Sequence, residues 1–315
     1  MNTAVIGAAG FVGPYLIDEI YNELSKDIIA TKLPHEELST NKAKPMNLDI
    51  LNIEHLSQFI KDNQPDYIFH LAAQSSVALS WKNPTLTIDI NIKGIVNLLD
   101  AIKKINDYHP KILIIGSGEE YGLIEKNKVP IKEEYVLKPG NIYAATKACQ
   151  NMIATIYAKA YNMNIVMTRS FNHFGPRQAP SFVVADFCKQ VADIENGKQE
   201  PKIIVGNLSS KRDFTDVRDV VCAYVKLINN GKPGETYNVG SGKSYNIEYI
   251  LKEIIKRSTK KISIEIDKNK FRPIDIPIIE ADIEKLRTDT GWEPKISISK
   301  TIEDTLNYWR KYSRN

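Results

Sequence analysis

The sequence predicts an α/β fold in which a doubly wound parallel sheet is joined to a smaller C-terminal α/β domain. Apolar runs of strand length alternate with amphipathic helical stretches through the first half of the 315-residue chain, and this alternation indicates a parallel sheet covered by helices on both faces. A glycine-rich turn follows the first apolar run. After residue 170 the loops become richer in proline, glycine and polar residues, which marks the second domain.

Hydrophobic periodicity places the individual elements. In the first half we expect strands at residues 3–6, 28–31, 67–70, 112–115 and 165–169, and helices at 12–24, 53–61, 84–106 and 143–160. In the second half we expect helices at 183–194, 217–228, 247–255, 283–287 and 299–312, and strands at 202–205, 236–239 and 262–266. The expected domains are therefore 1–169 and 170–315, with some segments of about 202–245 returning to the first sheet.

The composition argues against several kinds of partner and compartment. The formal charge is only +4 and the lysines are scattered, whereas a nucleic-acid surface needs clustered basic residues. No apolar run is long enough to cross a membrane, and the N-terminus lacks a secretion signal, so we expect a cytoplasmic protein. The three cysteines, Cys149, Cys188 and Cys222, lie far apart and predict neither a disulfide framework nor a metal site.

The glycine-rich turn predicts a dinucleotide site. Gly7, Gly10 and Gly13 have the spacing G-x-x-G-x-x-G directly after the first expected strand. Glycines remove side chains where the backbone must approach a pyrophosphate, and the helix that follows offers free N–H groups to the phosphates. We expect Phe11 and Val12, inside the turn, to contact the cofactor as well.

The end of the second expected strand bears on which dinucleotide is bound. A fold specific for NAD places an acidic residue there to hold the ribose 2′-hydroxyl. Here Thr31, Lys32 and Leu33 occupy that region, and Lys32 can pair with a 2′-phosphate instead. The sequence therefore favours NADP(H), while NAD(H) stays possible because Glu36 or Glu37 can fold back.

Tyr143 and Lys147 are the expected proton-transfer pair. They lie four residues apart on an expected helix and so share one face. A cation beside a phenol lowers its pKa from the usual value of about 10, so Tyr143 could exchange a proton with a carbonyl or hydroxyl oxygen, while Lys147 could also hold the nicotinamide ribose. Ser117 follows an expected strand and could stabilise charge on the same oxygen. Each residue alone also fits an ordinary helix or turn.

Taken together, these motifs resemble the extended short-chain dehydrogenase/reductase family, which has a Rossmann fold. The resemblance covers nearly the whole chain. Further similar segments follow in the family's order, namely DI at 49–50, HLAAQS at 70–75, Asn91, FNHFGP at 171–176, RDFTDVRDV at 212–220 and YNVG at 237–240.

The resemblance implies further site residues. Asp49 would contact the adenine amine, with Ile50 beside it, and the backbone of Leu71, Ala72 and Ala73 would line the middle of the cofactor. Residues 1–169 would form the NADP(H)-binding domain and 170–315 would mainly bind a nucleotide sugar. Its diphosphate would lie on Asn172, Arg212 and Arg272, because arginine suits phosphate oxygens. The complete set of implied substrate residues is Gln74, Ser75, Asn172, Lys189, Arg212, Arg272 and Asp275.

Other segments resemble the branch of this family that acts on GDP-mannose derivatives, namely SW at 80–81, GEEYG at 118–122 and TGWEP at 290–294. The branch contains a GDP-mannose 4,6-dehydratase and a reductase that converts GDP-4-keto-6-deoxy-D-mannose to GDP-D-rhamnose with NADPH. Glu119 stands where dehydratases carry their base, but reductases are similar there too. Residues 31–47 lack the arginine- and serine-rich arm of the dehydratases, so the resemblance favours the reductase.

Three alternatives remain open: the 4,6-dehydratase, another nucleotide-sugar epimerase, and a non-catalytic dinucleotide sensor. The resemblance also implies a homodimer in which helices 84–106 and 143–160 pair with the same helices of a second copy as a four-helix bundle. The apolar residues on these helices that would support the pairing are Ile88, Ile92, Ile95, Met152, Ile156 and Tyr157. They could equally pack on their own sheet.

Overall fold

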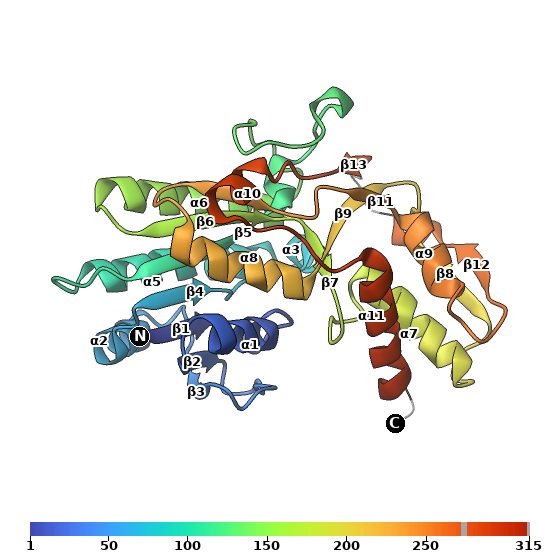
Figure 1. Ribbon diagram of the computed structural model, residues 1–315, viewed down its shortest axis with the longest axis horizontal. Helices are drawn as coiled ribbons and strands as arrows, with labels where there is room; N and C mark the ends of the chain where they lie inside the picture. The colour runs from blue at the N-terminus through green and yellow to red at the C-terminus, as the bar shows by residue number, and fades with distance from the viewer. Residues whose placement is uncertain (272–275, 314–315) are drawn as a thin grey trace.

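A seven-stranded parallel sheet forms the centre of the computed structural model, which describes residues 1–271 and 276–313 (Figure 1). Its strands are β1 (Asn2–Ile6), β2 (Asp27–Lys32), β3 (Lys44–Asn47), β4 (Tyr67–His70), β5 (Lys111–Ser117), β6 (Ile165–Ser170) and β10 (Thr236–Val239). They lie side by side in the order β3-β2-β1-β4-β5-β6-β10. This is the strand order of a Rossmann fold with one further strand, so the predicted fold class is confirmed.

Continuous apolar runs explain why the central strands form. All six residues of β6 and all four of β4 are buried, as expected where helices cover both faces of a parallel sheet. β3 was not predicted. It is an edge strand with mostly exposed residues, and its sequence, with Pro45 in second position, has neither an apolar run nor an alternating pattern.

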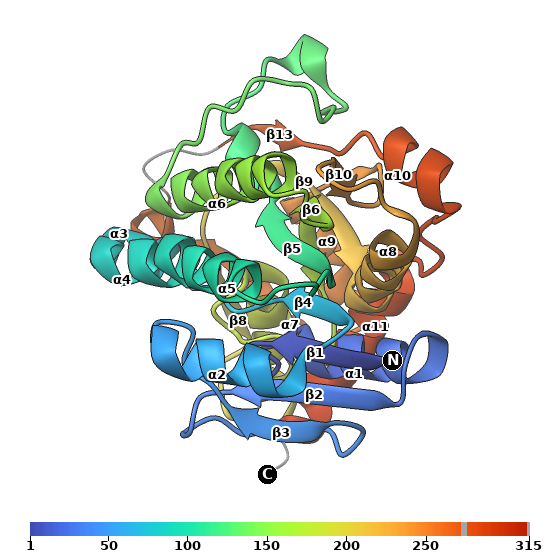
Figure 2. The same cartoon turned by 90° about the vertical axis from the view of Figure 1, so that its left-hand side faces the viewer.

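Helices cover both faces of the sheet (Figure 2). One face carries α1 (Gly13–Glu23), α8 (Val217–Asn230) and α10 (Glu284–Thr290), and the other carries α2 (Ile53–Asn63), α5 (Gly94–Lys103) and α6 (Ile142–Ala160). Each face has its own apolar core. Leu16, Ile20 and Tyr224 belong to the core under α1 and α8, and Leu56 and Leu98 belong to the core under α2 and α5.

The single helix predicted at 84–106 is divided in the structure. The chain forms α3 (Val77–Lys82), α4 (Pro84–Ile88), a π-helical segment η1 (Asp89–Lys93) and then α5. Asn83 starts α4 by accepting a hydrogen bond from the N–H of Leu86 at 3.2 Å. The π-helical segment carries Asn91, which is fully buried. Wide π-helical turns inside helices frequently occur at functional sites.

The second region lies beyond the carboxyl ends of the sheet strands (Figure 1). Its strands are β7 (Asn172–Phe174), β8 (Lys202–Val205), β9 (Lys211–Asp216), β11 (Ser244–Asn246), β12 (Ser263–Ile266) and β13 (Ile278–Ile279), and its helices are α7 (Val183–Glu195), α9 (Ile247–Ile255) and α11 (Ile298–Tyr312). Of the segment 202–245, α8 and β10 join the first sheet and its helical layer, whereas β8 pairs with β12 and β9 pairs with β7, β11 and β13. The three-residue-per-turn helices are η2 (Gly118–Tyr121), η3 (Lys126–Lys128) and η4 (Lys268–Lys270).

The acidic residues of the segment 212–220 hold this second region together. Asp213 accepts hydrogen bonds from the N–H and the hydroxyl of Ser241, at 2.7 and 2.6 Å. Asp216 caps α8 and binds the guanidinium of Arg218. Asp219 accepts two backbone N–H groups from the segment before α11. These three carboxylates therefore have structural partners.

Within the described residues, no helix combines the length and the apolar composition that crossing a bilayer requires.

Two glycines of the N-terminal turn should respond differently to alanine. A Cβ on Gly13 would lie 1.9 Å from the carbonyl oxygen of Ala8, whereas a Cβ on Gly10 would meet nothing closer than the Gly7 carbonyl oxygen at 3.9 Å. Gly13→Ala should therefore lower the free energy of unfolding by about 2 kcal/mol or more, because the backbone must move to relieve the clash. Gly10→Ala should change it by less than about 0.5 kcal/mol. Urea unfolding of both variants measures the difference, and equal effects would contradict this packing.

Candidate active site

The winding of the sheet reverses between β1 and β4, and the segments that follow these two strands meet at this point. The N–H groups of Leu71 and Ala72 both donate to the carbonyl oxygen of Ile6, at 2.9 Å. A Cβ on Gly7, whose φ is +83°, would lie 2.5 Å from the Cα of Ala72. Ligands of open α/β sheets bind in the crevice at such a switch point. Four of the predicted cofactor residues therefore lie together there: Gly7, Leu71, Ala72 and Ala73.

The glycine turn fits the phosphates of a dinucleotide. Helix α1 has Pro14 in its first turn, and no side chain caps its N-terminus at Val12, so its free N–H groups and positive dipole end face the turn. The packing of the protein itself leaves room for a side chain at position 10. A ligand that approaches the backbone closely at this position would require a glycine. The ring of Phe11 stacks on His173, with centroids 6.2 Å apart and planes 9° apart. This contact ties the turn to the second region.

The end of β2 places a lysine and a glutamate close together. The ammonium of Lys32 donates to the carbonyl oxygen of Leu33 at 3.2 Å, and the N–H of Leu33 donates to the Glu36 carboxylate at 2.8 Å. Glu36 therefore does fold back, but onto the backbone. Asp49 is exposed, and its carboxylate accepts the N–H of Leu51 at 2.9 Å.

Ser117, the last residue of β5, starts the short helix η2. Its hydroxyl accepts the N–H of Glu119 at 3.2 Å, and its own N–H donates to the carboxylate of Glu120 at 2.8 Å. These reciprocal bonds form a capping box. The hydroxyl of Ser117 is thereby fixed at the carboxyl end of the strand next to the start of α6.

Tyr143 lies in the first turn of α6. The side chain of Asn141 caps this helix by accepting the N–H of Ala144 at 2.8 Å, and the N–H of Tyr143 donates to the hydroxyl of Ser80 at 3.3 Å. Burial raises the pKa of the Tyr143 phenol to about 12, while a hydrogen bond with the Ser117 side chain acts in the opposite direction. Tyr143 and Ser117 are thus brought together as predicted, and the phenol is protonated at neutral pH.

Lys147 is buried and its ammonium is directed toward β5. It donates to the carbonyl oxygen of Ile115 at 2.8 Å and to the Gln150 side-chain oxygen at 3.0 Å. Burial lowers the pKa of Lys147 to about 8. The expectation that this lysine lowers the pKa of Tyr143 is therefore wrong for the observed arrangement: the ammonium has other partners, and the pKa of the phenol is raised rather than lowered.

Two predicted residues are committed to partners within the protein. The carboxylate of Glu119 accepts the side-chain N–H of Asn141 at 3.3 Å, so it faces the start of α6. The amide nitrogen of Gln74 donates to the Thr87 hydroxyl at 2.8 Å, and its amide oxygen accepts the N–H of Ser76. Both ends of the Gln74 amide therefore have partners inside the protein, and its assignment as a substrate ligand stays a prediction.

The predicted substrate residues of the second region are spread over three elements. Asn172 is exposed on β7, and Ser75 is exposed after β4. Arg212 is buried on β9, where it donates to the carbonyl oxygen of Ile276 at 2.6 Å. Lys189 on α7 pairs with Asp193 one turn later. Arg272 and Asp275 lie outside the described residues.

Sequence reasoning gave Asn91 no role, yet its side chain links the site together. Its oxygen accepts the N–H of Gln74 at 2.8 Å, and its nitrogen donates to the Thr146 hydroxyl at 3.0 Å. That hydroxyl in turn donates to the carbonyl oxygen of Tyr143 at 2.8 Å. Only the resemblance pointed to Asn91, because a π-helical segment has no clear sequence pattern.

Sequence reasoning also missed Glu120, whose side chain is fully buried. Its carboxylate pairs with Arg169 of β6 at 3.1 Å and accepts the side-chain N–H of Asn151 on α6 at 2.9 and 3.0 Å. Arg169 also donates to the Tyr121 hydroxyl at 3.0 Å. This polar network joins η2, β6 and α6, and it reaches Ser117 through the N–H that donates to Glu120.

His70 at the end of β4 is a further buried titratable group near the site. Within the described part of the chain neither ring nitrogen has a hydrogen-bond partner. Burial, together with the charge of Lys147, lowers the pKa of His70 to about 3. The imidazole is therefore neutral at physiological pH.

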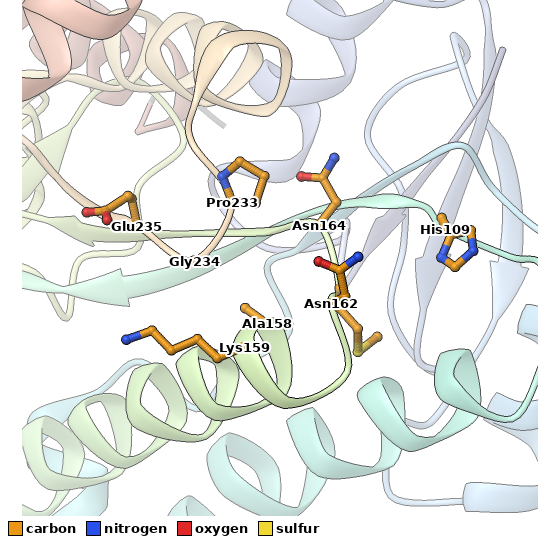
Figure 3. Close-up of a pocket in the computed structure, with 9 residues that line it drawn as sticks. His109, Ala158, Lys159, Asn162, Asn164, Pro233, Gly234 and Glu235 are labelled. Carbon is orange, nitrogen blue, oxygen red and sulfur yellow. The ribbon is translucent and has the colours of Figure 1, made fainter.

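A surface cavity of about 470 Å³ is lined by none of the residues described above (Figure 3). His109, Asn164 and Glu235, which line it, stand just before β5, β6 and β10. It therefore opens at the amino ends of the strands, whereas Gly7, Ser117 and the start of α6 lie at the carboxyl ends. The cavity is thus separate from the candidate active site.

The sequence is similar to a family of enzymes that act on nucleotide sugars. The model of the family described as GDP-mannose 4,6-dehydratase matches residues 4–305. A GDP-6-deoxy-D-mannose reductase of Pseudomonas aeruginosa is 31% identical over 310 residues, which cover 98% of this chain and 97% of the relative. The GDP-mannose 4,6-dehydratase 1 of Arabidopsis thaliana is 28% identical over 81% of this chain and 71% of its own length.

A solved structure is similar over the whole length. RMD from Pseudomonas aeruginosa in complex with NADPH superimposes with a TM-score of 0.87 at 29% identity and covers 99% of both chains. The shared architecture therefore includes the sheet, both helical layers and the second region.

Proposed function

The chain belongs to the GDP-mannose 4,6-dehydratase family of NAD(P)-dependent extended short-chain dehydrogenases/reductases, and we propose that it reduces the C4 ketone of GDP-4-keto-6-deoxy-D-mannose to give GDP-D-rhamnose. The observation that carries this proposal is the meeting of Ser117, at the end of β5, with Tyr143, in the first turn of α6. A proton donor and a second hydroxyl then face one reacting oxygen.

The residues at the switch point fit a nicotinamide dinucleotide, which supplies a hydride when bound. Gly10 would allow its pyrophosphate to approach the backbone, and the first N–H groups of α1 would bind the phosphate oxygens. The ammonium of Lys147 would hold the ribose. Residues 1–169 thus form the proposed cofactor domain.

The proton step uses this chain's own groups. As the C4 carbonyl carbon accepts a hydride, its oxygen becomes an alkoxide, and Tyr143 transfers its phenolic proton to that oxygen. Ser117 donates a hydrogen bond to the same oxygen and so orients the carbonyl. A phenol whose pKa lies near 12 is fully protonated before the step, and Tyr143 regains a proton from solvent after it.

We propose that residues 170–315 mainly hold the nucleotide sugar. Asn172 is exposed on β7 beyond the carboxyl end of β6, where a substrate's diphosphate would meet the cofactor edge. Arg212 can contact the diphosphate while its Nη1 keeps its bonds to the carbonyl oxygens of Lys211 and Ile276, because a guanidinium carries five N–H donors. The remaining proposed substrate residues are Ser75, Lys189, Arg272 and Asp275.

The cysteines are unpaired, as is usual in the reducing cytoplasm, where we place the reaction.

GDP-mannose 4,6-dehydration is the second candidate function. Glu119 is the observation that favours it, because its carboxylate lies within 3.3 Å of the Asn141 side chain that caps the helix of Tyr143. A base is needed there to remove the C5 proton. The absence of arginine from residues 31–47 favours the reductase.

We also propose a homodimer formed through α4 and α6, which pack side by side. Ile88, Met152 and Ile156 are 45%, 62% and 60% exposed, so they are available to a second copy. Ile95 is not available to a second copy, because it is fully buried in the core of its own sheet.

Ile156→Glu should convert the dimer to a monomer without unfolding it, as measured by light scattering during gel filtration. A wild-type protein that elutes as a monomer would refute this interface.

Removal of the phenolic hydroxyl tests the reaction itself. With GDP-4-keto-6-deoxy-D-mannose generated in situ, wild-type protein should oxidise one NADPH for each product molecule. Tyr143→Phe should lower kcat by about 100-fold or more, since it removes the proton donor, while binding of NADPH stays within about twofold. The loss of absorbance at 340 nm, with products identified by mass, measures turnover. Near-wild-type turnover by this variant would refute the assigned role.

Lys32 tests the choice of cofactor. If its ammonium pairs with the 2′-phosphate, Lys32→Ala should weaken NADPH binding by about 10-fold, the size of a charge-assisted contact, and leave NADH binding unchanged. Fluorescence titration of both dinucleotides gives the two affinities. Equal losses for NADPH and NADH, or no loss for either, would mean that Lys32 does not select the cofactor.

A further inference from the structure

We propose that Glu120 is a positioning residue of the reaction, which acts through Lys147: its buried carboxylate is the counter-charge that keeps the Lys147 ammonium protonated at the end of β5. The inference rests on the proposed function, in which Lys147 holds the cofactor ribose and Tyr143 donates the proton. It assigns a chemical role to a carboxylate that contacts neither substrate nor cofactor in that mechanism.

The carboxylate and the ammonium are held at the same place in the fold. Glu120 accepts the N–H of Ser117 at 2.8 Å, and Lys147 donates to the carbonyl oxygen of Ile115 at 2.8 Å. Both therefore bind the last three residues of one strand. Asn151, one helical turn after Lys147, donates to both carboxylate oxygens at 2.9 and 3.0 Å, so α6 is joined to Glu120 directly.

The position of Glu120 is fixed by donors from three elements. They come from β5 through the N–H of Ser117, from α6 through Asn151, and from β6 through the guanidinium of Arg169 at 3.1 Å. The Glu120 side chain is 0% exposed and that of Arg169 is 10% exposed. Burial raises the pKa of the Glu120 carboxyl, while the charge of Arg169 and the hydrogen bonds from Ser117 and Asn151 act against burial and favour the anion.

Two titratable side chains lie near Lys147, one on η2 and one on β4. The charge of Glu120 on η2 favours the protonated ammonium, while His70 on β4 is neutral and adds no charge. Burial acts against the ammonium and lowers its pKa to about 8. Without Glu120 the lysine would lose its proton nearer to neutral pH.

The charge of Glu120 also favours the protonated form of Tyr143. The charges of Glu119 and Glu120 both raise the pKa of the phenol, so the proposed proton donor keeps its proton. Loss of the Glu120 charge would lower the pKa of Tyr143 and also that of Lys147. Both changes would shift the alkaline decline of activity to lower pH.

The test is the substitution Glu120→Gln, which removes the charge but keeps an oxygen that can accept the N–H of Ser117. We would measure kcat/KM for the keto sugar and, separately, NADPH binding by fluorescence, each from pH 6 to pH 10. The alkaline limb of both profiles should move to lower pH by about one unit, the size expected for the loss of a close charge. At a pH above the shifted limb, kcat/KM of the variant, taken relative to its own plateau, should be about tenfold lower than that of the wild type.

Glu133→Gln is the matched control. The carboxylate of Glu133 accepts the N–H of Asn238 at 2.9 Å, and its backbone carbonyl accepts a bond from Arg169, so it belongs to the same network but does not face Lys147. The alkaline limbs of the kcat/KM and NADPH-binding profiles of this variant should lie at the same pH as those of the wild type. If Glu120→Gln leaves them there too, Glu120 is only a structural partner of Arg169 and the proposal fails.

Arg169 without its counter-charge could prevent the Glu120→Gln protein from folding. The double variant Glu120→Gln/Arg169→Met leaves no unpaired cation in the interior, and its alkaline limbs should also move to lower pH, because the charge that raises the pKa of Lys147 is that of Glu120. A folded double variant with wild-type limbs would equally overturn the proposal. If the wild type oxidises no NADPH with the keto sugar at any pH, the proposed function fails instead, and the pH profile of NADPH binding still tests Glu120.

Discussion

A buried ion pair at the end of β5 is the constraint on which the site depends. Glu120 and Arg169 join the central strand β5 to its neighbour β6, and Asn151 adds the helix α6. Because a charge left alone in the interior is very unfavourable, breaking such a pair by removing one partner typically costs about 3–5 kcal/mol. The network therefore holds Ser117 on the strand and Tyr143 on the helix in one relative position. A polar core therefore places Ser117 and Tyr143 relative to each other.

The topology of the sheet supplies the second constraint. Strand order reverses between β1 and β4, and the chain can pass close to itself there only because Gly7 has no side chain. The same close approach brings the N-terminus of α1 to the crevice beside β4. Tyr15 of α1 then donates to the carbonyl oxygen of Pro176 at 2.7 Å, and Phe11 stacks on His173. The glycine-rich turn and the second region are thus in direct contact.

The alternation of apolar strands with amphipathic helices was enough to predict a parallel sheet with helices on both faces, because right-handed crossovers place helices on the faces of such a sheet. It did not predict β3, which is an edge strand with little to bury, or the π-helical segment at Asn91, which depends on hydrogen bonds to Gln74 and Thr146. The spacing of Tyr143 and Lys147 placed them on one helix face. It could not predict that the ammonium binds Ile115 and Gln150, because those partners come from packing against β5. Glu120 was overlooked for the same reason, as only its burial distinguishes it from Glu119.

Isotope transfer tests the central claim, that this arrangement directs a hydride to the C4 carbon and a proton to its oxygen. NADPH labelled with deuterium at the transferred position of its nicotinamide would be supplied with GDP-4-keto-6-deoxy-D-mannose, and the product examined by mass spectrometry and NMR. The account predicts one deuterium at C4 of the sugar for each NADPH oxidised. A product without deuterium at C4 would contradict it. In a parallel reaction with GDP-mannose in place of the keto sugar, loss of water with no net oxidation of NADPH would also contradict it and would point to Glu119 and the dehydratase reaction.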